Sequence, residues 1–391
     1  MQTVRIGIIG VGNMGSAHAH CLHAGQIDGL VLTALCDCDP LRLQNCRETF
    51  PEVACFADGR ALMESGLVDA VVVAVPHRLH AAIALTALKM GLHVLVEKPI
   101  DITVSAAAQL NAAAKDSGRV FGIMFNQRTN PLFARAREIV RSGGIGQLKR
   151  TAWTVTNWYR TQAYYDSGSW RATWAGEGGG VLLNQAPHNL DIWQWICGMP
   201  THVCGFCNVG KYHNIEVEDE AMLYVRYENG ATGTFITSTG EYPGTNRLEI
   251  VGDCGQLVLE KGQLQYTRLS ASEREVCFSS SEGMPAIPCE REIYVPDGAE
   301  TAHAGILQNF ADAIRTGAPL LAPGQEGIAE LTLSNAAYLS AWEGNRWVEL
   351  PFDSAHFDEL LRQRCAASLY RDTQTPEAMP EGYSTRWQVN W

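Results

Sequence analysis

Three polar side chains follow a run of glycines near the middle of this 391-residue chain. Asn184, His188 and Asp191 come after glycines 178–180 at intervals of four and three residues, so on a single helix they share one face. We expect that helix over residues 181–197, which are otherwise rich in Leu, Ile and Trp. Histidine is the side chain best suited to moving a proton near neutral pH, so the stripe indicates a proton-transfer site. A solvated face or a histidine satisfied in the core is the alternative.

Lys98 is the second candidate, in the sequence Glu97-Lys98-Pro99. It follows a predicted strand over His93–Val96, and ligands of open α/β sheets bind beyond the carboxyl ends of the strands. A lysine there can give or take a proton at a substrate oxygen if the site lowers its pKa. Pro99 keeps the backbone of Lys98 extended, which aims the side chain. The alternative is a solvated lysine after a strand.

The segment Gly10-Val11-Gly12-Asn13-Met14-Gly15 has the residue types of a dinucleotide site. It lies between a predicted strand, Val4–Ile9, and a predicted helix over residues 14–24, whose free N–H groups attract an anion. Gly10 permits a tight turn, Gly12 lets the backbone approach phosphates, and Gly15 lets the helix pack on the strand. An ordinary glycine-rich turn is the alternative.

Asp37 strengthens the dinucleotide interpretation. It ends the next predicted strand, Leu30–Cys36, roughly 20 residues after the glycines, where the acid that binds the adenosine ribose is expected. A carboxylate at this position repels a 2′-phosphate and therefore favours NAD over NADP. Arg42 lies close enough in sequence to weaken that preference.

The elements that position these residues change in kind near residue 125. Strands and helices alternate over residues 1–125, which predicts a doubly wound parallel sheet, a Rossmann fold. Residues 126–350 contain two predicted helices, several alternating segments between 203 and 294, and two further helices. We expect there a C-terminal α/β domain with a mostly antiparallel open sheet that leaves one face free. Residues 351–391 read as a polar tail.

Composition narrows the class of protein. The formal net charge of −12 argues against nucleic acid and against an anionic membrane as partners. No apolar run is long enough to span a membrane, and the first strand begins too early for a signal peptide. Twelve scattered cysteines fit reduced thiols, so we expect a cytoplasmic protein. No metal site is expected, because asparagine is a poor ligand and no further histidine pair accompanies His188.

Five segments, taken together and in order, resemble one known family. They are GIIGVGNMGSAHA at 7–19, Asp37 with Asp39-Pro40, Val75-Pro76-His77-Arg78-Leu79-His80, ALKMGLHVLVEKP at 87–99 and GGGVLLNQAPHNLD at 178–191. Over most of residues 3–345 the chain resembles the glucose–fructose oxidoreductase, inositol dehydrogenase and rhizopine-catabolism oxidoreductases, the Gfo/Idh/MocA family. The resemblance implies bound NAD, oxidation of a sugar or cyclitol hydroxyl, and a homo-oligomer, dimer or tetramer, formed through the second sheet.

The resemblance also implies roles for single residues. Lys98 and His188 match the family's catalytic lysine and histidine, and Asp191 matches an acid that orients or charge-stabilises His188. Asn184 stands where many members have aspartate; it cannot carry a proton, although it can hydrogen-bond a substrate hydroxyl. His80 matches a histidine near the nicotinamide ribose, whereas His77 stands where asparagine is more usual. The predicted coenzyme site comprises Gly10, Gly12, Asn13, Met14, Gly15, Asp37, Pro76, His77, His80, Glu97 and Lys98.

Aromatic, basic and amide side chains elsewhere fit the substrate side of such a site. Flat rings cover the C–H faces of a sugar, and arginine or asparagine donates to its hydroxyls. The predicted substrate residues are Asn126, Arg128, Trp158, Tyr159, Trp170, Arg171 and Asp191, with interface or core packing as the alternative for each ring.

The sequence therefore predicts an NAD(H)-dependent oxidoreductase in which Lys98 and His188 surround the reacting oxygen. Two alternatives stay open. One is a glycosidase that uses tightly bound NAD for transient oxidation and elimination. The other is a non-catalytic dinucleotide-binding sensor, since a fold does not dictate a function.

Overall fold

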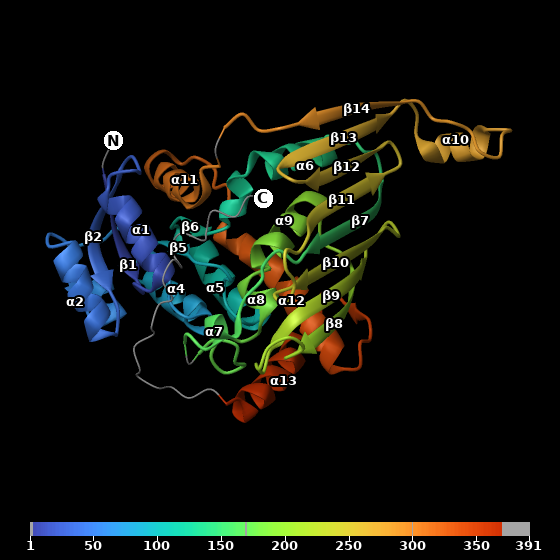
Figure 1. The fold of residues 1–391 in the computed structure, drawn as a ribbon. Helices are drawn as coiled ribbons and strands as arrows, with labels where there is room; N and C mark the ends of the chain where they lie inside the picture. Colours follow the sequence, from blue (N-terminus) through green and yellow to red (C-terminus); the bar gives the residue numbers. More distant parts are fainter. Residues whose placement is uncertain (1–2, 169, 299, 370–391) are drawn as a thin grey trace.

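Two sheets organise the chain (Figure 1). The computed structural model describes residues 3–168, 170–298 and 300–369. The first sheet is entirely parallel, with the order β3-β2-β1-β4-β5-β6. Its strands are β1 (Val4–Ile9), β2 (Leu30–Cys36), β3 (Ala54–Phe56), β4 (Ala70–Val73), β5 (His93–Val96) and β6 (Phe121–Ile123). This order reverses direction beside β1, which is where a Rossmann sheet binds its dinucleotide.

Helices connect the parallel strands, and local sequence sets their ends. They are α1 (Asn13–His23), α2 (Pro40–Thr49), α3 (Gly59–Glu64), α4 (His80–Lys89) and α5 (Val104–Ser117). Asp39 caps α2 by accepting from the Leu41 amide at 2.8 Å, and Gly118 ends α5 in the left-handed conformation at φ 63°. The predicted doubly wound parallel sheet is confirmed.

The second sheet has the order β14-β13-β12-β11-β7-β10-β9-β8-β15, and only its β7–β10 pair is parallel. The prediction of a mostly antiparallel sheet is therefore confirmed. Its strands are β7 (Leu148–Val155), β8 (His202–Val209), β9 (Glu218–Arg226), β10 (Thr232–Ser238), β11 (Asn246–Gly252), β12 (Gly255–Glu260), β13 (Gln263–Leu269), β14 (Cys289–Tyr294) and β15 (Val348–Glu349).

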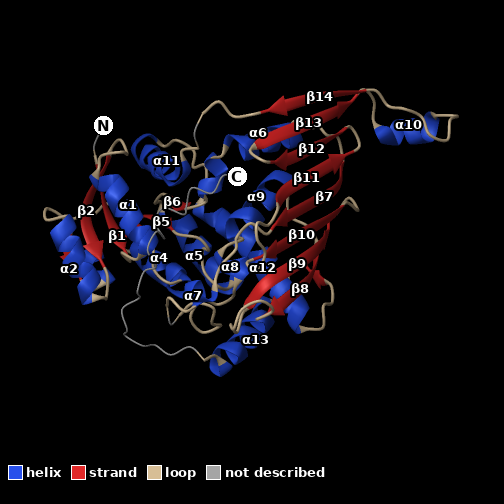
Figure 2. Ribbon diagram, in the orientation of Figure 1, coloured by secondary structure: helices blue, strands red, loops and turns tan. Residues whose placement is uncertain are grey.

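Helices cover one face of this sheet and lie between the two sheets (Figures 1 and 2). They include α6 (Pro131–Arg141), α9 (Pro187–Cys197) and α12 (Gly327–Trp342). Trp193 of α9 stacks on Phe235 of β10 with ring centroids 5.6 Å apart, which anchors the helix to the sheet. The strands alternate buried and exposed residues, so the other face carries the exposed side chains of Phe206, Met222, Tyr224 and Trp347.

The chain then returns to the first domain. After β14, α11 (Ala302–Thr316) packs beside the 3-10 helix η2 (Asn126–Thr129), and the Ile123 amide of β6 donates to Ala322 O at 3.0 Å. A further 3-10 helix, η3 (Gly324–Glu326), leads into α12. The two domains are thus joined at more than the single crossover after β6, which holds the residues at the ends of the parallel strands against the second domain.

One expectation about elements was wrong, and several elements were not predicted. Residues 181–197 form two helices, α8 (Val181–Asn184) and α9, because Pro187 has no N–H to continue the first. The predicted tail contains α13 (Ser354–Ala367), which buries Phe357 and Leu361; residues 370–391 lie outside the described residues. The short helix α10 (Glu273–Ser279), which projects beyond β14 in Figure 1, and strands β14 and β15 were not predicted. Within the described parts of the chain, every helix is too short or too polar to cross a membrane.

Candidate active site

The glycine-rich turn leaves no room for a side chain at two of its three glycines. Gly10 has φ +92°, and a Cβ there would lie 2.4 Å from Ala74 O. A Cβ on Gly15 would lie 1.8 Å from Gly10 O, so the first turn of α1 packs directly on the strand end. Gly12 is different, because a Cβ there would meet only Arg42 Nη1, at 3.6 Å. The turn is tightly packed at Gly10 and Gly15 and open at Gly12, the position expected to face phosphate.

The N-terminus of α1 adds donors to this turn. Asn13 and Met14 open the helix, and no described side chain caps it. Its first N–H groups are therefore available to an anion.

Asp37 ties the end of β2 to the glycine turn. Its Oδ2 accepts from the Val11 amide at 2.8 Å and its Oδ1 from the Asp39 amide at 2.9 Å. Arg42 Nη1 lies 3.6 Å from the same carboxylate. A carboxylate fixed in this way, beside an open turn, fits the ribose end of a dinucleotide.

Lys98 bridges the two domains. It follows β5, and its Nζ donates to the main-chain oxygen of Asn184 at 2.9 Å. Burial lowers the pKa of Lys98, while the carboxylates of Glu97, Glu177 and Glu330 act in the opposite direction. A lysine with a lowered pKa spends more time as the neutral amine, which is the form that accepts a proton.

Glu97 precedes this lysine and turns its side chain toward α1. Its Oε1 lies 2.7 Å from His18 Nε2 on α1, and both side chains are buried. Burial by itself would raise the pKa of Glu97, but the hydrogen bond with His18 and the positive neighbours outweigh it and hold the pKa at about 2. The carboxylate is therefore ionised and links α1 to the end of β5.

His188 opens α9 within the same cluster. Burial, with a smaller effect of Lys98 and His303, lowers its pKa well below the ordinary value, so the imidazole is neutral at pH 7. Its buried Nδ1 has no hydrogen-bond partner among the described residues. A buried nitrogen without a partner is uncommon in a folded protein and indicates a place for a ligand atom.

Two further histidines lie near Lys98. His80, at the start of α4, has its ring nitrogens 2.7 Å from Pro99 O and from Val75 O. His77 follows Pro76 in the 3-10 helix η1 (His77–Leu79), and its Nδ1 lies 3.2 Å from Glu177 O. Burial lowers the pKa of both rings. The His77 ring also meets Trp170 edge-on, with centroids 6.0 Å apart.

The loop over 170–180 supplies the opposite wall. Arg171 lies over the Trp170 ring at 4.5 Å and donates to Tyr164 Oη at 3.1 Å. Asn184 donates from Nδ2 to Glu177 Oε1, and its Nδ2 also lies 3.4 Å from Tyr164 Oη. Of the residues predicted from sequence, Lys98, His188, Asn184, His77, Trp170 and Arg171 thus fall in one cluster.

Arg128 and Asp191, both predicted to face substrate, pair with each other. Arg128 donates from Nε at 2.8 Å and from Nη2 at 2.7 Å to the two oxygens of Asp191, and both side chains are fully buried. Gln194 Nε2 donates to the same carboxylate at 2.9 Å. Asp191 was expected to orient His188, but no hydrogen bond joins their two side chains. Helix α9 instead turns Asp191 toward η2.

The remaining predicted substrate residues are scattered. Asn126 lies in η2 with its buried Oδ1 lacking a partner among the described residues. Trp158 is buried, and Tyr159 is exposed, with its ring 5.9 Å from Tyr242. Their contact with a substrate stays a prediction.

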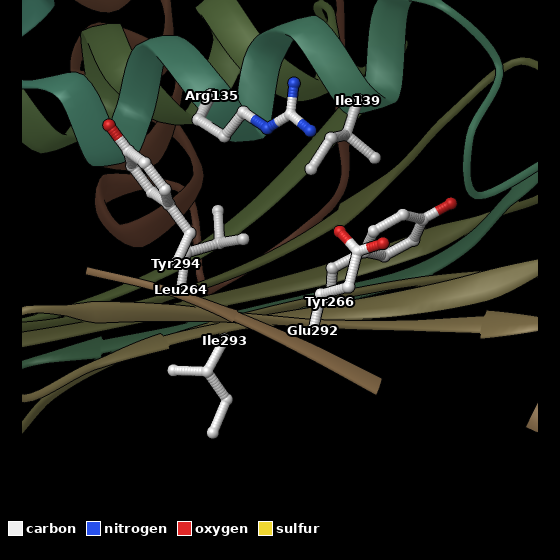
Figure 3. A pocket seen from close by; sticks show the side chains of 7 residues that line it. All are labelled: Arg135, Ile139, Leu264, Tyr266, Glu292, Ile293 and Tyr294. Atoms are coloured by element: carbon white, nitrogen blue, oxygen red, sulfur yellow. The ribbon is translucent and has the colours of Figure 1, made fainter. Parts of the chain in front are cut away.

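Sequence reasoning missed several residues of the cluster. Glu177, Tyr164, His303 and Glu330 all face Lys98 or its partners. Glu177 carried a signal, since it directly precedes the glycine run; the other three come from segments far apart in sequence that only the fold brings together. A separate cavity of about 390 Å³ lies between α6 and strands β13 and β14, lined by Arg135, Ile139, Leu264, Tyr266, Glu292, Ile293 and Tyr294, and contains none of these residues (Figure 3).

A Rossmann sheet, a glycine turn with its acid, and a lysine at a strand end beside a neutral histidine define a dinucleotide-dependent oxidoreductase. Comparison with known families gives the same class. Residues 4–125 match the oxidoreductase family with an NAD-binding Rossmann fold, and residues 133–258 match the GFO/IDH/MocA C-terminal domain. The chain belongs to the Gfo/Idh/MocA family of NAD-binding oxidoreductases, as its resemblance predicted.

Individual relatives are distant but extend over the chain. Levoglucosan dehydrogenase of Pseudarthrobacter phenanthrenivorans is 26% identical over 91% of this chain and 100% of that protein. Myo-inositol 2-dehydrogenase of Thermotoga maritima is 24% identical over 87% and 97%. A 1-carboxy-3-chloro-3,4-dihydroxycyclohexa-1,5-diene dehydrogenase of Comamonas testosteroni is 29% identical, but the match spans 65% of this chain and 62% of that protein.

A solved structure gives the same picture. WlbA dehydrogenase of Chromobacterium violaceum, in complex with NADH and UDP-GlcNAcA, superposes with a TM-score of 0.77. It is 25% identical, and the match covers 90% of this chain and 97% of that one.

Proposed function

We propose that the chain is an NAD(H)-dependent dehydrogenase that interconverts a secondary hydroxyl of a sugar, glycoside or cyclitol with the ketone, using Lys98 and His188 as acid and base. The observation that carries the proposal is the 2.9 Å contact of Lys98 Nζ, from the end of β5, with Asn184 O in the second domain. The neutral His188, with its unpartnered Nδ1, belongs to the same cluster. Full-length relatives named for levoglucosan and inositol support the substrate class.

In this reaction the protein transfers a proton and orients the substrate. A bound NAD⁺ would be the oxidant and would accept the hydride that leaves the substrate carbon on its conversion to a carbonyl. The hydroxyl proton passes to Lys98 Nζ or to the His188 ring, and burial lowers the pKa of both groups, which favours the neutral forms that accept a proton. In the reverse direction the same group returns the proton to the carbonyl oxygen. Trp170, Arg171 and Asn184 are proposed to orient the ring of the substrate.

The coenzyme is proposed to lie along the ends of the first sheet. Gly10, Gly12, Asn13, Met14 and Gly15 would hold its phosphates, and Asp37 its adenosine ribose, which favours NAD over NADP. Pro76, His77, His80, Glu97 and Lys98 would surround its nicotinamide end.

We also propose a homo-oligomer, dimer or tetramer, formed through the open face of the second sheet. That face exposes Phe206, Met222, Tyr224 and Trp347, and exposed apolar side chains gathered on one face favour association. Sedimentation velocity of the purified protein measures this directly, and a monomer at micromolar concentration would contradict it.

A substrate panel tests the proposed activity. Purified protein is incubated with sugars, cyclitols and glycosides in the presence of NAD⁺, and both NADH absorbance and released sugar are followed. NADH formation with one or more alcohols supports the proposal. Sugar released from a glycoside without NADH accumulation would instead identify the glycosidase alternative. NAD⁺ binding without either reaction would identify the sensor, and no binding of either coenzyme form would overturn all three.

A further inference from the structure

A buried carboxylate, Glu177, stands directly before the glycine run and has no role in the scheme above. Its side chain is 1% exposed. Its Oε1 accepts from Asn184 Nδ2, and its Oε2 accepts from the Ala172 amide at 2.7 Å. Ala172 has φ 54°, so the backbone adopts a left-handed conformation where it meets the carboxylate. Both oxygens of Glu177 therefore accept from groups of the substrate side.

Asn184 connects this carboxylate to Lys98. The main-chain oxygen of Asn184 accepts from Lys98 Nζ at 2.9 Å, while its side-chain nitrogen faces Glu177. An ionised carboxylate only accepts hydrogen bonds, so Glu177 requires the amide nitrogen, and not the amide oxygen, on its side. Tyr164 Oη lies 3.4 Å from the same nitrogen, Nδ2 of Asn184. The carbonyl oxygen of the Asn184 side chain is thus the atom left to accept from a substrate hydroxyl.

The charges around Lys98 make Glu177 important for a second reason. The groups that face this lysine are the carboxyls of Glu97, Glu177 and Glu330, the phenol of Tyr164, and the rings of His77, His80, His188 and His303. Glu97 already pairs with His18. Burial raises the pKa of Glu330 well above its ordinary value, and burial lowers the pKa of His77 and of His188 well below theirs. Burial raises the pKa of Glu177, whereas the N–H groups that donate to its two oxygens and the charges of Arg171 and Lys98 favour its ionised form. Glu97 likewise accepts at both oxygens, from His18 and from the Lys98 amide.

We propose that Glu177 is a positioning residue for the reaction: through Asn184 it supplies the carboxylate that residue 184 itself lacks, fixing the Asn184 amide as an acceptor for substrate and holding a negative charge beside the Lys98 ammonium. The inference rests on the proposed dehydrogenase function. It explains why an amide suffices at residue 184, because the negative charge sits one hydrogen bond further out.

The test begins with Glu177→Gln, which keeps the size of the side chain and removes its charge. A lost negative neighbour makes the Lys98 ammonium easier to deprotonate, so the acidic limb of the kcat/KM profile should move down by about one pH unit. KM for the substrate should rise by roughly tenfold, because the side-chain amide of Asn184 can then rotate and exchange the places of its oxygen and nitrogen. NADH affinity, followed by fluorescence titration, should stay the same.

The exchange Glu177→Gln with Asn184→Asp provides the rescue. It keeps one carboxylate and one amide in the same hydrogen bond with their places swapped, so KM and the pH profile should return to within about threefold of the wild type. Asn184→Asp alone opposes two carboxylates and should not behave in this way.

Glu218→Gln is the matched control. Glu218 is also a buried carboxylate of this region, and it accepts from the Gly180 and Leu182 amides at 2.9 Å each. Its replacement should lower Tm and leave the pH profile in place. If Glu177→Gln likewise lowers Tm only, Glu177 has a structural role and the proposal is wrong.

A second measurement needs no substrate. The chain has six lysines, so ε-¹³C-lysine labelling gives few signals, and the Lys98→Met spectrum identifies the signal of Lys98. Its NMR titration should move to lower pH in Glu177→Gln and return in the exchange variant. No movement overturns the inference even if the dehydrogenase activity stands. If the Lys98 titration shifts clearly but no alcohol of the substrate panel gives NADH, the proposed dehydrogenase function is wrong, whereas the charge coupling between Glu177 and Lys98 stands.

Discussion

The buried ionic groups at Arg128 and at Lys98 differ in how completely they are paired. Arg128 places its guanidinium on both oxygens of Asp191, on Leu321 O at 3.1 Å and on Glu326, and lies 5.3 Å from the rings of Phe125 and Trp195. Among the described residues, the Lys98 ammonium donates to one main-chain oxygen. A saturated cluster stabilises the fold, whereas an unsaturated one keeps hydrogen-bonding capacity for a ligand.

The neighbours of each cation follow the same division. Asp191 is held by three donated hydrogen bonds, whereas His188 Nδ1 and both oxygens of Glu330 lack partners within the described parts of the chain. Incompletely paired, buried titratable groups gather at active sites more often than elsewhere. The comparison therefore assigns Arg128 to stability and Lys98 to chemistry, and four substitutions test that division.

The largest effect is expected from Lys98→Met. Removing the group that exchanges the substrate proton should lower kcat by roughly a thousandfold, since general acid–base catalysis contributes about 10²–10⁴. Tm should fall less than in Arg128→Met, because the ammonium makes one hydrogen bond, the apolar replacement has a similar length, and Glu97 keeps His18 as its partner. Steady-state kinetics on the best substrate of the panel and a thermal melt measure the two quantities.

NADH affinity of Lys98→Met is the control measurement. NADH affinity should change far less than turnover, because the phosphate and ribose ends are held at the glycine turn and Asp37. Unchanged turnover in Lys98→Met would remove this residue from the reaction.

Arg128→Met should give the opposite pattern. It leaves the Asp191 carboxylate buried without its partner, which costs about 3–5 kcal/mol of the free energy of unfolding. The folded fraction that remains should turn over substrate at close to the wild-type rate. Urea denaturation measures the stability, and activity is normalised to the folded fraction.

The double substitution Arg128→Met with Asp191→Leu is the control. It removes both charges together and should recover most of the lost stability, because the penalty comes from the unpaired carboxylate. If Arg128→Met instead folds well and loses turnover, these residues do contact substrate, as the sequence first indicated.

The first domain was predictable because its signals are local. The continuous apolar strands, the glycine turn and Asp37 each define a position within one βαβ unit, and the unit has one common way to fold. Lys98 was placed at the end of β5 by the same logic, since a parallel strand brings its carboxyl end to the binding edge.

The second domain was less predictable because its site depends on a break and on distant partners. Helical spacing put Asn184, His188 and Asp191 on one face, but Pro187 separates two helices and Asp191 turns to Arg128. Glu177 lies seven residues before Asn184, but the glycines between them follow no helical or strand period that would indicate the contact. His303 and Glu330 reach Lys98 from segments much further along the chain. Side chains that meet only through tertiary folding have no periodicity from which they could be read.

Asp37→Ala removes a buried carboxylate whose pairing is less complete than that of Arg128 and more complete than that of Lys98. Its carboxylate accepts two backbone N–H groups and keeps Arg42 at 3.6 Å. Losing the acid should weaken NADH binding by about tenfold and reduce the discrimination against NADPH, because the carboxylate that repels a 2′-phosphate is gone while Arg42, which also faces Asp39, stays in place. Fluorescence titration with both coenzymes measures this change. Equal affinities in the wild type would show that Asp37 does not select the coenzyme.

Glu330→Gln should give the smallest effect at neutral pH and tests the unsaturated side of the comparison. Burial raises the pKa of Glu330 well above its ordinary value, so we expect the folded protein to carry it as the neutral acid at pH 7. Glutamine is also neutral, and turnover at pH 7 should change by less than about twofold. The difference should appear in stability against pH. Below about pH 4.5 both folded and unfolded chains hold the proton, and the contribution of Glu330 is fully present.

Above that pH the unfolded wild type releases the proton while the folded one keeps it, so its free energy of unfolding should fall relative to Glu330→Gln, by at most about 1.4 kcal/mol for each pH unit, until the folded pKa is passed. Urea denaturation of both proteins between pH 4 and pH 8 measures the slope. Parallel curves would mean that Glu330 is ionised in the folded state, and the carboxylate opposite Lys98 would then be Glu330 as well as Glu177. That outcome would mean that more charged groups around Lys98 are paired, and the Lys98 cluster would then differ less from the Arg128 cluster.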